Sequence, residues 1–275
     1  MKWRSEAALA LALTVGWPCE ADAYFGEDPE HPQVTDRSAY TVPKGMHKIS
    51  LFSVEYGLID QLQMVTYPFW WQLFAPNAGL EWQFVRQERW SMSLGVQGMY
   101  LSTRPFRWFF PDLPVADAGI IPIDLAASVR LHDDWSMHMG SLLTFVIVSG
   151  RLDEDDLQGA AALSNLQQHL TIEWRLSRVI ALLLHGRYQV AQQTKAAADA
   201  ELQLDEFTTI RAAALAESDV LDFPHAFHVV PSIQFSWETF NLRLGLGYGN
   251  IVIPTVNFVL PERTLVPDFA MYWRF

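Results

Sequence analysis

The stretch Asn241–Gly249 reads NLRLGLGYG and decides the fold class. Leu242, Leu244, Leu246 and Tyr248 fall on one face of an extended chain, and small or polar residues fall on the other. A hydrophobic period of two predicts a β-strand with one apolar and one polar face. A fold built from such strands should repeat this alternation along the chain.

The alternation recurs along most of the sequence. At the C-terminus Phe269, Met271, Trp273 and Phe275 share one face, with polar and small residues between them. The alternating stretches predict eleven strands joined as hairpins. Their expected ranges are 46–56, 61–66, 78–87, 90–101, 119–131, 135–148, 166–175, 179–190, 225–237, 240–250 and 265–275.

Most of these strands are long for a soluble sheet, in which about five or six residues are usual. A tilted strand that crosses a bilayer needs about nine to eleven residues. The polar faces carry Gly, Ser, Gln, His and charged residues, which is typical of the interior of a transmembrane barrel. A soluble β-sandwich also alternates, but it does not need such long strands.

The connections between the strands alternate in length. Short ones are expected at 57–60, 86–89, 132–135, 175–178 and 237–240, and long ones at 67–77, 102–116, 149–165, 191–223 and 250–264. Transmembrane barrels have short periplasmic turns and longer outer loops. If the chain ends on the periplasmic side, every short turn falls there.

The strand number should be even in a single-chain bacterial barrel. A twelfth strand at 38–42 would complete the set, and Pro43 would suit its end because proline lacks an N–H. The fold class predicted is an all-β, antiparallel up-and-down transmembrane barrel with 12 strands preferred, within a range of 10–12. The alternative is ten strands with one assignment wrong.

Composition narrows the function classes. Half of the 275 residues are hydrophobic, 18% are charged, and the formal net charge is −12. Nucleic-acid binding is not expected, because it needs a basic face. With one cysteine, Cys19, an intrachain disulfide is impossible and a cysteine-rich metal site is not expected.

The N-terminus has the pattern of an export signal. Lys2 and Arg4 precede an apolar run at 7–16, and small residues at Ala21 and Ala23 suit cleavage before residue 24. We expect a signal peptide at 1–23, a periplasmic segment at 24–37 and the barrel at 38–275. A lipid anchor on Cys19 is a weaker alternative, because bulky residues precede it.

The C-terminal strand resembles the terminal signature of Gram-negative outer-membrane β-barrel proteins, in which the last residue is typically Phe. The match consists of Met271, Tyr272, Trp273, Arg274 and Phe275. The resemblance implies localisation in the outer membrane, contact with outer-membrane lipid, and recognition by the barrel-assembly machinery through Met271, Trp273 and Phe275. It implies no named subfamily and no oligomeric state.

Catalytic and metal-binding patterns are weak. Barrel lipid hydrolases carry a His and a Ser two positions apart, and here the nearest pair is His169 and Thr171. His225 and His228 are three apart, so on a strand they face opposite sides. The acidic run 153–156 could bind Ca²⁺ but is more typical of a solvated loop. We expect no enzyme, no metal and no cofactor.

The segment 191–223 is rich in alanine and is expected to be partly helical, either as a cap or plug or as a surface excursion. The lumen is the best candidate for function. The charged and imidazole side chains expected to line it are Asp124, Arg130, His169, Glu173, Arg175, His185, Arg187, Arg243, Asp268 and Arg274. They could line a passage for small solutes, or pair across a narrow barrel and close it. The leading hypothesis is a pore or transport protein, and the alternative is a structural or surface-binding barrel that acts through its outer loops.

Overall fold

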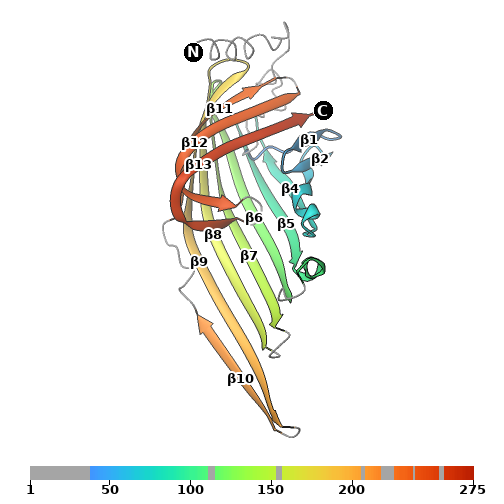
Figure 1. The fold of residues 1–275 in the computed structure, drawn as a ribbon. Helices are drawn as coiled ribbons and strands as arrows, with labels where there is room; N and C mark the ends of the chain where they lie inside the picture. The colour runs from blue at the N-terminus through green and yellow to red at the C-terminus, as the bar shows by residue number, and fades with distance from the viewer. Residues whose placement is uncertain are drawn as a thin grey trace, which may run out of the picture.

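The computed structural model describes residues 38–110, 115–152, 157–205, 208–217, 226–237, 239–253 and 257–275. Nearly all of these residues are in β-strands (Figure 1). The strands are β1 (His47–Ser50), β2 (Val54–Ile59), β3 (Leu62–Thr66), β4 (Asn77–Arg86), β5 (Trp90–Ser102), β6 (Val115–His132), β7 (Trp135–Leu152), β8 (Leu157–Arg175), β9 (Ile180–Asp205), β10 (Thr208–Glu217), β11 (Phe227–Ser236), β12 (Phe240–Ile253) and β13 (Phe258–Arg274). The short helix α2 (Pro68–Gln72) and the 3₁₀ helix η1 (Arg104–Trp108) lie between strands.

Twelve of the strands close into one antiparallel barrel. From β1 to β9, each strand pairs with the next strand along the chain. The first half of β9 also pairs with β11, β11 pairs with β12 and β12 with β13, and β13 pairs with β1 to close the ring. The preferred number of twelve and the up-and-down topology are confirmed. The extra strand, β10, pairs only with the distal half of β9, residues 195–205.

The twelfth strand arises differently from our prediction. Residues 38–42 form no strand, and the segment expected as one strand at 46–56 is the hairpin of β1 and β2. The turn forms because the Ser50 hydroxyl accepts hydrogen bonds from the backbone N–H groups of Phe52 and Ser53. This local bonding of serine, typical of turns, explains the poor alternation of that stretch.

The prediction of helix in 191–223 is also wrong for its described part. Residues 191–205 continue β9, and residues 208–217 form β10. The two strands make a hairpin that extends well beyond the rest of the barrel (Figure 1). Alanine has high helix propensity, but strand pairing with β8 and β10 overrides that weak preference here.

The inner and outer faces differ as in a membrane barrel. Where burial is described in β4 to β9 and in β11 to β13, buried polar side chains alternate with exposed apolar ones, so the core is the polar interior of the ring. Aromatic side chains gather where strands meet the short turns: Trp135 stacks on Trp174 at 5.3 Å, and Phe240 contacts Trp273 at 5.1 Å between ring centroids. Phe145 lies ten residues beyond Trp135 on β7 and is also exposed. At about 3.3 Å per residue and a tilt of about 40°, these two aromatics are about 25 Å apart along the barrel axis, the height of an outer-membrane apolar band.

The wall is uneven in height. β6 to β9 have 18 to 26 residues, whereas β1, β2 and β3 have only four, six and five. The height of the wall changes abruptly where β13 pairs with β1 to close the barrel. β13 has 17 residues, but only Tyr272, Trp273 and Arg274 pair with β1. No helix among the described residues is long and apolar enough to cross a membrane.

Candidate functional site

The lumen is crossed at its short-turn end by residues 38–43, which we call the strap. Ala39 and Val42 are fully buried, although neither belongs to a strand. The Ala39 N–H donates to the Ser128 hydroxyl at 2.7 Å, and the Val42 N–H donates to the Gln63 side-chain oxygen at 2.6 Å. A strap held by inward-facing residues of β3 and β6 therefore spans the ring.

Two further contacts fix the middle and the end of the strap. The Thr41 hydroxyl donates to the Gln83 side-chain oxygen on β4 at 3.0 Å. Pro43 passes directly over Gly57 on β2, where a Cβ atom would overlap the carbonyl oxygens of Val42 and Pro43. Glycine is needed at position 57 because only a residue without Cβ lets the strap approach so closely.

Beyond the strap the lumen contains two cavities of about 430 Å³ and about 210 Å³. The larger lies in the range of small-molecule sites, which is about 300–1,000 Å³. The two cavities share part of their lining, so they lie next to each other inside the barrel. The shared residues are Lys48, Glu55, Tyr67, Gln97, Asp124, Leu142, His185 and Arg187.

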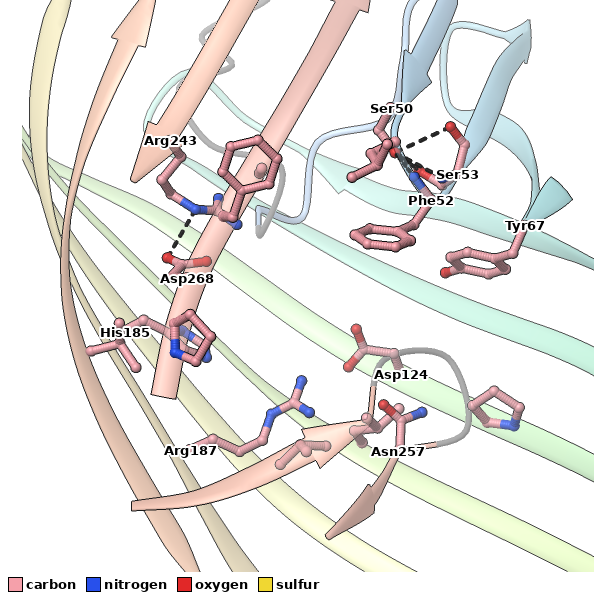
Figure 2. Close-up of a pocket in the computed structure, with 18 of the residues that line it drawn as sticks. Ser50, Phe52, Ser53, Tyr67, Asp124, His185, Arg187, Arg243, Asn257 and Asp268 are labelled. Atoms are coloured by element: carbon pink, nitrogen blue, oxygen red, sulfur yellow. Dashed lines mark hydrogen bonds and ion pairs between the residues drawn. The ribbon is translucent and has the colours of Figure 1, made fainter. Parts of the chain in front are cut away.

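Several charges of the cavity wall are paired. Lys48 contacts Glu55 at 2.9 Å, an ion pair between neighbouring β1 and β2. Arg243 on β12 contacts Asp268 on β13 at 3.0 Å, and Asp268 also accepts a hydrogen bond from Ser232 at 2.6 Å (Figure 2). Buried charges need such partners, since an isolated buried ion is strongly destabilising.

Arg187 differs from the other cavity cations. Its side chain points from β9 into the cavity, opposite Asp124 (Figure 2). Among the described residues no carboxylate lies within ion-pair distance of its guanidinium, and its buried Nε has no hydrogen-bond partner. Asp124 is 3.4 Å from the His169 ring nitrogen instead. As far as the described part of the chain goes, the cavity therefore presents to a solute a guanidinium that has no carboxylate partner.

The structure divides the ten lumen residues expected from sequence into two groups. The first group lines the cavities, and its members are Asp124, His169, His185, Arg187, Arg243 and Asp268. The second group lies closer to the short turns, and its members are Arg130, Glu173, Arg175 and Arg274. Within the second group Glu173 is fully buried, 3.3 Å from Arg175 and 3.7 Å from His138.

Sequence reasoning missed other parts of the site. Lys48 lies in the segment whose alternation is poor, and Tyr67 lies in a connection, so neither shows a strand pattern. The strap, expected as a wall strand, crosses the lumen instead. A usable signal is present in Gly57 and Pro43, since a glycine within a strand often marks a close backbone approach.

The candidate metal-binding and catalytic residues lie only partly within the described part of the chain. The described residues contain no cluster of three or more His, Cys, Asp or Glu side chains that could hold a metal ion. His225 and the acidic run 153–156 lie outside the described residues, as do the expected signal peptide and the segment 24–37. His169, the nearest approach to a hydrolase pattern, contacts Asp124 and lines the smaller cavity.

A closed, even-numbered antiparallel barrel with an apolar exterior and a polar interior is the architecture of Gram-negative outer-membrane β-barrel proteins, and this chain has that architecture. No protein-family model matches the sequence, and no curated protein matches it. Similar solved structures include the toluene transporter TodX of Pseudomonas putida, with 9% identity, a TM-score of 0.30 and coverage of 83% of this chain and 77% of that one.

Two other solved structures give similar values. The monoaromatic hydrocarbon channel CymD has 9% identity and a TM-score of 0.34, covering 85% of this chain and 88% of that one. CdiB from Escherichia coli has 9% identity and a TM-score of 0.33, covering 84% of this chain and 62% of that one.

Proposed function

We propose that this chain is an outer-membrane transport barrel that passes small solutes through its lumen, with the strap as the closure at the periplasmic end. The observation that carries the proposal is a lumen with two adjoining cavities, lined in part by charged side chains, inside a ring whose outer face is apolar. A barrel with a purely structural role would be filled by side chains, as the smallest barrels are.

The strap favours a gated passage over a permanently open pore. It is held by hydrogen bonds from backbone and hydroxyl groups to side chains of β3, β4 and β6, not by a continuous strand ladder. Each such bond contributes about 0.5–1.5 kcal/mol net, so a segment held this way can leave without unfolding the wall. Transmembrane barrels have their short turns on the periplasmic side, so in this proposal the strap lies at the periplasmic end.

Solute flux tests the proposal. The refolded chain in liposomes should release small charged and neutral solutes and retain solutes larger than the lumen, when efflux is followed against protein-free liposomes. A heat-modifiable band on a gel establishes that the barrel has folded. Folded barrels that retain every solute would refute the transport function.

A structural or surface-binding role is the second candidate. The observation in its favour is the hairpin of β9 and β10, which extends beyond the rest of the barrel at the long-loop end (Figure 1). If surface binding is the function, shortening this hairpin should abolish that binding. If transport is the function, shortening the hairpin should leave solute efflux unchanged.

A further inference from the structure

Among the described residues, the wall of the closed barrel is lower on one side than elsewhere. On the edge that faces β1, residues 258–270 of β13 have no partner strand among the described residues, because β1 ends at Ser50 and the chain turns back into β2. We call the stretch between this free edge and the turn at 50–53 the side gap. The last contact below it is the hydrogen bond from the Leu51 N–H to the Met271 carbonyl oxygen, at 3.2 Å.

The side gap lies at membrane depth. Four residues of a tilted strand rise about 10 Å, whereas the apolar band of an outer-membrane barrel is about 25 Å tall. β1 therefore covers less than half of that band, and β2 and β3 are hardly longer. β13, with 17 residues, spans the band completely and presents its free edge along it.

The free edge is adapted to remain unpaired. His47 exchanges backbone hydrogen bonds with Phe275, and Leu51 donates to Met271, so the odd-numbered residues of β13 direct their N–H and C=O groups toward the β1 side. Pro267 has the same parity, so the N–H that it lacks would have pointed into the side gap. Proline is found on sheet edges for this reason.

The larger cavity borders the side gap. Its lining includes Phe269 and Met271, which face outward from β13, together with inward-facing Asp268 of the same strand. Across the gap it is lined by Leu51 and Phe52, as well as by the lumen residues (Figure 2). Because the lining runs without interruption along residues 266–271 of β13 and continues at Leu51 and Phe52, the larger cavity lies along the free edge of that strand.

The two ends of this cavity differ in chemistry. At the side gap Leu51, Phe52 and Phe269 are about half exposed, at 53%, 46% and 47%. Phe52 contacts Phe69 of α2 at 6.4 Å between ring centroids, which extends the apolar rim. At the inner end lies Arg187, the cavity cation that lacks a carboxylate partner among the described residues.

Unpaired backbone at membrane depth is tolerated where it lines a water-filled space. The free edge of β13 therefore indicates that water from the lumen reaches the side gap. An amphiphile at this place would keep its tail among apolar side chains and its head in the wet lumen. A guanidinium without a partner selects an anionic head, because a charge-assisted pair compensates the buried charge.

We propose that the side gap is a lateral opening between the bilayer and the lumen, and that the ligand of the cavity is an amphiphilic acid whose anionic head binds Arg187 and whose tail lies along Phe52 and Phe269. The proposal rests on the transport function proposed above and names its substrate class. A purely hydrophilic solute would use the lumen axis and would not need the side gap.

Binding of a homologous series tests the ligand class. The full chain, refolded into phosphatidylcholine nanodiscs, should bind decanoate more tightly than octanoate by about fourfold per methylene, and should bind decanol and acetate weakly. Empty nanodiscs give the background of partition into lipid. Arg187→Gln should weaken decanoate binding by about 10- to 100-fold, whereas Arg89→Gln, which removes the same charge from an exposed turn, should have no effect.

A covalent block tests the lateral route. In a Cys19→Ser background, Ala270→Cys places a thiol on the part of β13 that lines the cavity, and a bulky thiol reagent is attached after folding. The adduct should slow decanoate association at least tenfold. The same adduct on Leu182→Cys, which faces lipid from β9, is the control.

The outcomes separate the two proposals. If Arg187→Gln leaves the affinity for decanoate unchanged, the role of Arg187 in binding an anionic head is overturned. If the adduct on Ala270→Cys leaves the association rate of decanoate unchanged, the lateral opening is overturned. If decanoate does not bind while liposomes still release small hydrophilic solutes, the inference fails and the transport function stands. If neither binding nor release occurs, both fail.

Discussion

Loosening the strap should open the short-turn end of the barrel. The double variant Gln83→Leu with Ser128→Ala removes the acceptors of the Thr41 and Ala39 N–H groups. Both donors lie in a fully buried part of the chain. A buried donor left without an acceptor costs about 1–3 kcal/mol, so the strap-bound state should lose about 2–6 kcal/mol. At tenfold per 1.4 kcal/mol, the lower figure alone raises the population of the released strap about 30-fold.

Amide hydrogen exchange of the strap peptide measures this population directly, because exchange from a closed segment requires opening. The exchange rate of residues 39–42 should rise at least 30-fold in the double variant. Ser141→Ala with Gln168→Leu is a matched control, since these side chains form an exposed hydrogen-bonded pair away from the strap. Unchanged exchange of the strap in the double variant would show that the side chains of Gln83 and Ser128 do not hold it in place.

Four further outcomes are expected. Gly57→Ala should displace the strap by steric overlap with Pro43 and give faster strap exchange in the same assay, and protected amides in that variant would contradict the close approach. Asp268→Asn should destabilise the barrel by about 3–5 kcal/mol, measured by urea unfolding on heat-modifiability gels, because it leaves buried Arg243 without its carboxylate. Leu244→Arg, on the lipid-facing side of β12, should cost about 2–4 kcal/mol in the same assay, and a neutral effect would mean that inside and outside are reversed. Phe275→Asp should lower the amount of folded protein in the outer membrane, and normal levels would count against an assembly signal in the last strand.

Sequence periodicity predicts the barrel wall well where burial enforces it. On β12 and β13 a polar lumen and an apolar exterior alternate residue by residue, so the sequence alone places Arg243 and Phe269 on opposite faces. A register slip of one residue would exchange those faces, which makes the pattern strong. The same reasoning yields the ten candidate lumen residues.

Periodicity cannot predict what depends on contacts far apart in sequence. The strap is held by Ser128, which is 89 residues from Ala39, and no local pattern reports such a pairing. Short β1 and β2 carry too few residues for a period to stand out, so their sequence indicates a single strand. The hairpin of β9 and β10 shows the converse failure, since an alanine-rich composition indicates helix where strand pairing prevails.

In the transport function proposed above, the lumen is a passage that the strap closes. The most direct test is the conductance of the refolded chain in a planar bilayer, compared with a chain that lacks residues 38–43. Rare, brief openings are expected for the full chain, and steady, discrete conductance steps are expected for the shortened one. Barrels that fold but stay electrically silent in both forms would contradict it.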